Sequence, residues 1–147
     1  MHLTRKASYG VIAALGLAKC ADGRPVPARR LAADYGLPQA FVEKILHEMK
    51  GAGLVRARQG RGGGYALSRP PGEVSVGDVL AALDESLDLV GCLDPASEES
   101  CNLLDRCPTR STWKTINARF REMLDSMTVA DLATGGPQPP ASLDKQT

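Results

Sequence analysis

The stretch that decides the fold is residues 28–67, which read ARRLAADYGLPQAFVEKILHEMKGAGLVRARQGRGGGYAL. Its first part predicts a short helix over 28–35, with Leu31 facing inward and Gly36 as the stop signal. A second helix follows after a Leu-Pro turn and runs to about Gly51. Two short helices joined by a tight, glycine-containing turn are typical of a helix-turn-helix.

The second part of this stretch predicts a β-hairpin. Residues 54–58 and 65–67 have strand character, and the glycine-rich segment 59–64 lies between them. A hairpin directly after the second helix of a helix-turn-helix is a wing. The expected fold class is therefore mainly α with a small β-hairpin, namely a winged helix-turn-helix domain followed by a long helix.

The apolar spacing of the neighbouring helices predicts which faces are buried. A first helix begins at the N-cap residue Thr4, and its expected inner stripe is Val11, Ile12, Leu15 and Ala18. In the helix that ends near Gly51, the expected inner face is Phe41, Val42, Ile45, Leu46 and Met49. Ser75 and Asp78 match a capping box, which predicts a further helix up to Leu83.

A long helix is expected over about residues 109–127, where apolar residues recur at intervals of three and four. These residues are Trp113, Ile116, Phe120, Met123 and Met127. The repeat forms a narrow seam of the coiled-coil kind. It favours self-association into a homodimer over the alternative, in which the helix packs only against its own domain.

The expected organisation has four parts. They are a winged helix-turn-helix domain over 1–86, a cysteine loop over 87–108, a dimerisation helix with its cap over 109–134, and a disordered tail over 135–147. The tail is expected to be disordered because it contains three prolines within four residues and few apolar side chains.

The charge is divided sharply between the two halves of the chain. Residues 1–70 carry 12 Lys and Arg against 4 Asp and Glu, whereas residues 71–147 carry 6 against 13, giving +8 and −7. Such asymmetry indicates nucleic acid as the partner of the basic half. The alternative is that the two halves simply attract each other.

The exposed face of the helix ending near Gly51 is a candidate base-reading surface. It offers Gln39, Ala40, Glu43, Lys44, His47 and Lys50. An amide such as Gln39 can bond an adenine edge, and a carboxylate such as Glu43 can accept from cytosine. For His47, a solvated surface role is the alternative.

The remaining candidate DNA contacts are basic. The wing carries Arg56, Arg58 and Arg61 among glycines, which let the backbone approach a groove closely and suit phosphates or a narrow minor groove. Arg5, Lys6, Arg29 and Arg30 are expected to contact phosphates and thereby to position the protein without reading sequence.

Neither a signal peptide nor an apolar run of the roughly 20 residues that span a membrane is visible, so the chain is expected to be cytoplasmic and to have no membrane partner. In that reducing compartment, clustered cysteines more often bind metal or act in redox chemistry than form structural disulfides. Cys20, on the first helix, is instead expected to pack in the interior.

The cysteine cluster consists of Cys92, Cys101 and Cys107, which are separated by eight and five residues. Thiolates bind both zinc and iron–sulfur clusters. Structural zinc sites usually contain cysteine pairs separated by roughly two to four residues, and no such pair is present. The spacing favours an iron–sulfur cluster, while a zinc site and a regulatory disulfide between two of the cysteines remain open alternatives.

The chain resembles the IscR/NsrR-type family of bacterial winged-helix repressors over about residues 1–133. The resemblance is carried by residues 3–6 with Tyr9, the wing at 60–65, the stretches 76–79 and 83–86, and the three cysteines followed by Trp113. It implies a homodimer that holds an iron–sulfur cluster in the loop before the dimerisation helix. It further implies sensing of cluster supply, iron, nitric oxide or redox state.

The chain also departs from the family pattern. Its first cysteine gap is longer than is typical, and Arg110 stands where the IscR-like pattern has a histidine. A guanidinium has no lone pair to offer a metal. The NsrR-like pattern takes a carboxylate from the first helix of the partner chain, and here Ser8 stands nearby. The fourth ligand is therefore open, which slightly favours a 4Fe–4S over a 2Fe–2S cluster, because the former can leave one iron to a small molecule or water.

The sequence therefore predicts a dimeric transcription regulator, expected to be a repressor, that binds a double-stranded DNA operator and receives its input at the three cysteines. A small electron-transfer protein is the rival from another class, but it needs neither a recognition helix nor an arginine-rich wing. No nucleophile and base stand in a catalytic arrangement, so an enzyme is not predicted.

Overall fold

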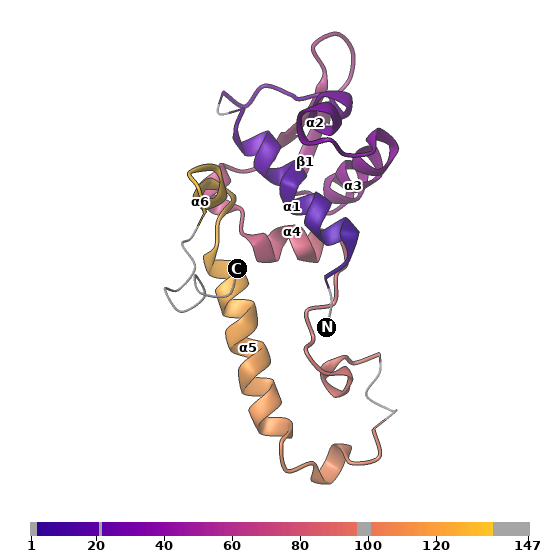
Figure 1. The fold of residues 1–147 in the computed structure, drawn as a ribbon, viewed down its shortest axis with the longest axis vertical. Helices are drawn as coiled ribbons and strands as arrows, with labels where there is room; N and C mark the ends of the chain where they lie inside the picture. The colour runs from indigo at the N-terminus through magenta and orange to yellow at the C-terminus, as the bar shows by residue number, and fades with distance from the viewer. Residues whose placement is uncertain (1–2, 21, 97–100, 137–147) are drawn as a thin grey trace.

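The computed structural model of the chain describes residues 3–20, 22–96 and 101–136 (Figure 1). Its elements are α1 (Arg5–Ala18), α2 (Ala28–Tyr35), α3 (Gln39–Gly51), β1 (Val55–Arg58), β2 (Gly64–Leu67), α4 (Val76–Ala82), α5 (Arg110–Ser126) and α6 (Val129–Ala133). Short 3-10 turns occur at Pro71–Glu73, Gly91–Leu93 and Leu104–Arg106. A mainly helical chain with one small hairpin confirms the predicted fold class. The expected disordered tail lies, from residue 137 onward, outside the described residues.

The first helix buries only part of the face that its hydropathy predicts: Ala18 is buried and Val11 packs against the core. Thr4 caps α1 as expected, because its hydroxyl accepts a hydrogen bond from the Ala7 N–H at 3.1 Å. Val11, Ile12 and Leu15 are only half-buried, however. The fully buried positions are mostly small residues, namely Ala7, Gly10, Ala13, Ala14, Gly16, Leu17 and Ala18. They allow neighbouring helices to approach closely, and a side chain at position 10 would collide with Leu83.

The helix-turn-helix forms as the sequence predicts. Gly36 ends α2 with a left-handed φ of 65°, a conformation that glycine adopts at little cost. The inner face of α3 is fully buried at Val42, Ile45, Leu46 and Met49. Phe41, expected on that face, is half-buried and packs edge-on against Tyr9, with ring centroids 5.4 Å apart.

The wing is an antiparallel hairpin that pairs Val55 with Leu67 and Arg58 with Gly64. It is also tied to the helices, since Val26 and Tyr65 exchange two backbone hydrogen bonds of 2.8 Å. A two-stranded hairpin alone is marginally stable in water, so this attachment and the burial of Val55 hold the wing in place.

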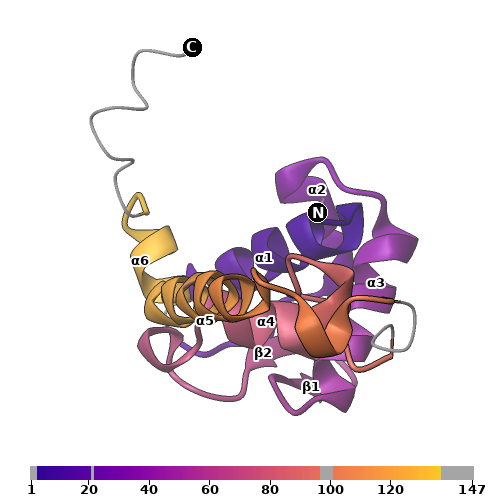
Figure 2. The same cartoon turned by 90° about the horizontal axis from the view of Figure 1, so that it is seen from below.

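We call residues 3–83 together with α6 the head, and α5 the arm. The capping box predicted at Ser75 and Asp78 is present and begins α4. After the arm, the chain returns to the head, because the Val129 N–H donates to the Val74 carbonyl at 2.8 Å and α6 packs on α1. Figure 2 shows the arm beside α4, and the two helices are in contact.

Figure 1 shows that the C-terminal end of the arm adjoins the head, whereas the N-terminal end of the arm lies far from the head. The cysteine loop, residues 87–108, runs from the base of the head to the far end of the arm. Among the described residues, no helix is long and apolar enough to cross a lipid bilayer.

Candidate nucleic-acid interface and cysteine loop

The outer face of α3 is exposed to solvent. All six candidate base-reading residues are exposed, namely Gln39, Ala40, Glu43, Lys44, His47 and Lys50. The Gln39 Nε2 donates a hydrogen bond of 2.9 Å to the Glu43 Oε1. This pair, one helical turn apart, presents an amide and a carboxylate side by side, and both would exchange this bond for bonds to base edges.

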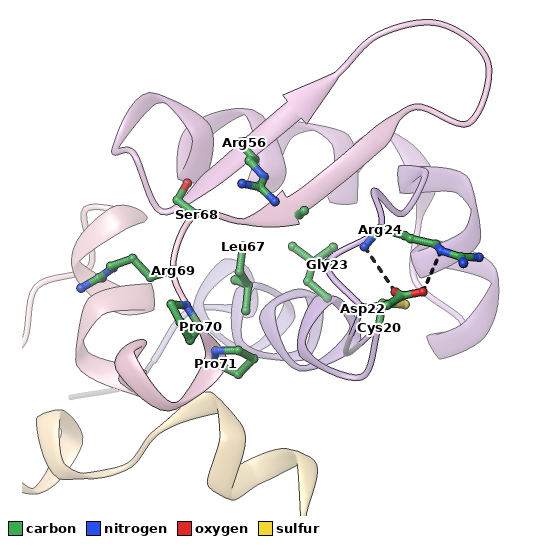
Figure 3. A pocket seen from close by; sticks show the side chains of 12 residues that line it. Cys20, Asp22, Gly23, Arg24, Arg56, Leu67, Ser68, Arg69, Pro70 and Pro71 are labelled. Atoms are coloured by element: carbon green, nitrogen blue, oxygen red, sulfur yellow. Dashed lines mark hydrogen bonds and ion pairs between the residues drawn. The ribbon is translucent and has the colours of Figure 1, made fainter.

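All three wing arginines are exposed, and Arg56 and Arg58, two residues apart on β1, line one cavity of about 330 Å³. Arg58 and Arg61 are exposed and have no ion pair among the described residues. The Arg56 side chain points toward Gly23 (Figure 3), at a cavity of about 410 Å³ between the wing, the end of α1 and the segment 68–71. Arg58 and Arg61 are therefore better placed than Arg56 for contact with a DNA backbone.

The phosphate-contact candidates also differ in their freedom. Arg5 and Arg29 are exposed and unpaired among the described residues. Lys6 forms an ion pair of 3.1 Å with Glu48, which ties α1 to α3, and Arg30 lies 3.7 Å from Asp34. A lysine held within the head has less freedom to follow a phosphate, so Lys6 is the weakest member of this set.

The structure places the three loop cysteines at separate points of the cysteine loop. Cys92 lies in the turn Gly91–Leu93, and Cys107 follows the turn Leu104–Arg106. All three are half-buried free thiols, and residues 97–100, with Glu98 and Glu99, lie outside the described part of the chain. Within the described part, no three His, Cys, Asp or Glu side chains gather as metal ligands. Cys20 is half-buried against the head core and lines the cavity behind the wing (Figure 3).

Cys107 lies beside groups that favour its ionised form. Its Sγ lies 3.5 Å from the Thr109 Oγ1, and this hydrogen bond is the main cause that lowers the pKa of the Cys107 thiol. The backbone of Thr109 and the guanidinium of Arg110 also lower the pKa. Thiolates, not thiols, bind metals, so the donor set in this loop suits a soft-metal group.

Sequence reasoning missed Asn117, which joins the cysteine loop to the arm. Its Oδ1 accepts a hydrogen bond of 2.9 Å from the Leu89 N–H, and its Nδ2 donates one of 3.2 Å to Asp88. Arg121, one turn further along the arm, donates to the same Asp88 oxygen at 2.9 Å. The sequence did contain a signal for this residue. Asn117 lies four positions after Trp113 and three before Phe120, so it is a polar residue on an otherwise apolar stripe of the helix.

The apolar seam of the arm is largely uncovered in the single chain. Trp113, Ile116 and Met123 are 39%, 42% and 47% exposed, while Phe120 and Met127 are half-buried. Phe120 packs beside the small cluster of Ala7, Leu80, Leu87 and Leu124, which fixes the arm to the head. Three large exposed apolar side chains on one helix are characteristic of an interaction surface.

Comparisons with known proteins agree with this arrangement. The Rrf2 family, described as iron-dependent transcriptional regulators, matches residues 3–135. The HTH-type transcriptional regulator IscR of Aliivibrio salmonicida is 35% identical over 132 residues, which cover 90% of this chain and 77% of that protein.

Two solved structures have a similar fold. CymR, the global cysteine regulator of B. subtilis, superimposes with a TM-score of 0.74 at 26% identity, covering 93% of this chain and 99% of that one. IscR of T. potens superimposes with a TM-score of 0.71 at 28% identity, covering 100% of this chain and 92% of that one.

Proposed function

The chain belongs to the Rrf2 family of transcriptional regulators, and we propose that it is a homodimeric repressor whose operator binding responds to an iron–sulfur cluster in the cysteine loop. That it is a DNA-binding regulator and not an enzyme follows from the family. The observation that supports the cluster part is the set of three free cysteines in the loop of a chain from an iron-dependent family, and the loop is joined to the arm at both ends. Cys107 lies three residues before Arg110, where the arm begins, and Asn117 holds the other end.

In this proposal, α3 reads base edges in a major groove, while the wing follows the neighbouring backbone. Gln39 and Glu43 contribute to base selection, and Ala40, Lys44, His47 and Lys50 complete the surface. Arg5, Arg29, Arg58 and Arg61 neutralise phosphates. Because the target is DNA, the expected place of action is the cytoplasm.

In a homodimer, the second chain binds the second half-site of the operator. The exposed side chains of Trp113, Ile116 and Met123 need a cover, and the same seam on a second copy is complementary in character. Two copies joined along their arms would present two α3 helices, whose separation must match half-sites about one helical turn apart. Any change where the cysteine loop joins the arm would then alter operator affinity.

Cys92, Cys101 and Cys107 are the proposed cluster ligands. Three protein thiolates suit a 4Fe–4S cluster better than a 2Fe–2S cluster, because only the former tolerates one iron without a protein ligand. When bound, the cluster supplies a redox-active group that is sensitive to oxidants, nitric oxide and iron supply. The hydrogen bond from Thr109 lowers the pKa of the Cys107 thiol, which favours loss of the proton that a metal ligand must give up.

A thiol sensor without a cluster is the second candidate. Two observations favour it: the Thr109 hydrogen bond that lowers the pKa of the Cys107 thiol, and the similarity to a solved protein that is named as a global cysteine regulator. In that case, a disulfide between two of the loop cysteines would be the input.

DNA binding distinguishes the two candidates. A duplex is enriched from a random-sequence pool by anaerobically purified protein, and its affinity is measured before and after a chelator removes metal. We expect a change of roughly 5–150-fold, the usual range of coupling between two sites. Cys101→Ser should behave like the chelator-treated protein. A response to the oxidant diamide in a colourless protein would favour the thiol sensor, and equal affinities in all forms would remove the loop as an input.

A further inference from the structure

Asn117 is an unusual residue for its position. It is 6% exposed, and Ser75 is the other buried polar residue in the described part of the chain. The burial of Ser75 is explained by its capping box, since its hydroxyl accepts from the Asp78 N–H. Nothing within α5 itself requires a buried amide at position 117, so the reason for it lies in the segment that it contacts.

The hydrogen bonds around Asn117 fix the orientation of its amide. The amide oxygen accepts from the Leu89 backbone N–H, and the amide nitrogen donates to the Asp88 carboxylate. In the flipped orientation a donor would face the Leu89 donor and an acceptor would face the Asp88 acceptor. The Asp88 side chain is only 15% exposed, and Arg121 balances its negative charge. We call Asp88, Leu89, Asn117 and Arg121 the latch.

The latch lies where the head, the cysteine loop and the arm meet. Leu87, immediately before it in sequence, is buried with Leu80 and Leu124 and fixes the loop entrance to the head. Cys92 follows Leu89 by three residues, and Asn117 stands seven residues, or about two helical turns, into the arm. The entrance of the loop is therefore held by the arm, to which Cys107 is also joined through the chain at the loop exit.

We propose that Asn117 is a positioning residue that sets the distance between the two ends of the cysteine loop and so couples the loop thiolates to the arm. The inference rests on the proposed cluster, but it concerns residues that are not its ligands. A loop held at both ends on one rigid helix cannot rearrange its cysteines without straining the latch. Conversely, a movement of the arm relative to the head, where Leu87 fixes the loop entrance, would strain the latch.

The chain offers an isosteric way to break and restore the latch. Asn117→Asp keeps the acceptor for the Leu89 N–H but replaces the donor to Asp88 with a second carboxylate. The double variant D88N/N117D returns a donor to that contact, and the aspartate at position 117 then stands one turn from Arg121. Gln59→Glu, at an exposed wing position, introduces the same charge far along the chain and serves as the control.

Two measurements separate positioning from general stability. The first is the rate at which anaerobic protein loses its visible cluster absorbance to excess EDTA. We expect Asn117→Asp to lose it about tenfold faster or more, as outer-shell changes around metals commonly cost 10–100-fold in affinity. D88N/N117D should return to within about threefold of the wild type. The second is hydrogen exchange of the Leu89 amide in cluster-free protein, which should be protected in the wild type and less so in Asn117→Asp.

The outcomes distinguish the latch from the proposed function. If the wild type binds a cluster and Asn117→Asp loses it at the wild-type rate, the latch proposal is wrong and the proposed function stands. A double variant that loses its cluster as fast as the single one also overturns the latch. A wild type without a cluster overturns both proposals, and an unprotected Leu89 amide in folded wild type overturns the latch alone.

Discussion

The head and the arm are stabilised in different ways. In the head, α3 buries Ile45 and Leu46 completely against other head elements. In the arm, only Asn117 and Leu124 of seventeen residues are buried, and Ile116 is 42% exposed. The head therefore has a buried core within one chain, whereas the arm leaves most of its apolar seam exposed.

The largest expected effect comes from breaking the arm seam. Ile116→Glu should make the protein monomeric or insoluble, because a charge on the seam cannot be covered by a second copy. The affinity for a two-half-site duplex should fall by roughly 10²–10⁴-fold, since the two half-sites are no longer bound together. Analytical ultracentrifugation and DNA titration measure both effects.

The control for the seam is Thr115→Glu, which adds the same charge at an exposed position beside it. It should leave the assembly state unchanged. A wild-type protein that sediments as a monomer at micromolar concentration would contradict the dimer, and the arm would then need another partner.

Two isoleucines sharpen the comparison between head and arm. Ile45→Ala removes a fully buried side chain and should lower the free energy of unfolding by about 2–5 kcal/mol, independently of protein concentration. Ile116→Ala should weaken the dimer, so its effect on the urea midpoint should be small at concentrations where the wild type is monomeric and should grow as protein concentration rises above the wild-type dissociation constant. Equal, concentration-independent losses in the two variants would mean that the arm is part of the same core as the head.

The smallest expected effects concern the wing of the head. Arg58→Ala and Arg61→Ala should each reduce the slope of log affinity against log salt by about one, because each removes one phosphate contact. Glu43→Ala should instead relax base preference and keep much of the affinity. Arg119→Ala, an exposed arginine on the arm, is the control and should leave the salt slope unchanged. Wing variants that bind DNA with the wild-type salt slope would show that the wing does not contact phosphates.

The head was largely predictable from sequence because its signals are local. Gly36 ends α2, the Ser75 capping box begins α4, and the apolar spacing of α3 marks its buried face. The family resemblance is confirmed, and so are the DNA-binding function and the winged fold. The predicted inner face of α1 was only partly right, with Ala18 buried and Ile12 and Leu15 half-buried, because hydropathy ranks large aliphatic residues above alanine and glycine. Close helix packing selects the small residues instead.

The candidate site was harder to predict, because its contacts join distant parts of the sequence. The Lys6–Glu48 ion pair spans 42 residues, and the Asn117–Leu89 hydrogen bond spans 28. The direction of Arg56, toward Gly23, depends on how the wing meets the end of α1. The cysteine ligands, the DNA contacts and the domain limits therefore stay predictions that experiments must test.

The most direct test of the central claim is anaerobic purification followed by an absorption spectrum with iron and sulfide analysis. It is applied to the wild type and to Cys20→Ser, Cys92→Ser, Cys101→Ser and Cys107→Ser. The wild type and Cys20→Ser should be coloured and contain iron and sulfide, because Cys20 packs against the head core. The three loop variants should lose both, since two thiolates cannot hold the cluster. A colourless wild type with one zinc ion per chain would contradict the account and replace the cluster with a zinc site.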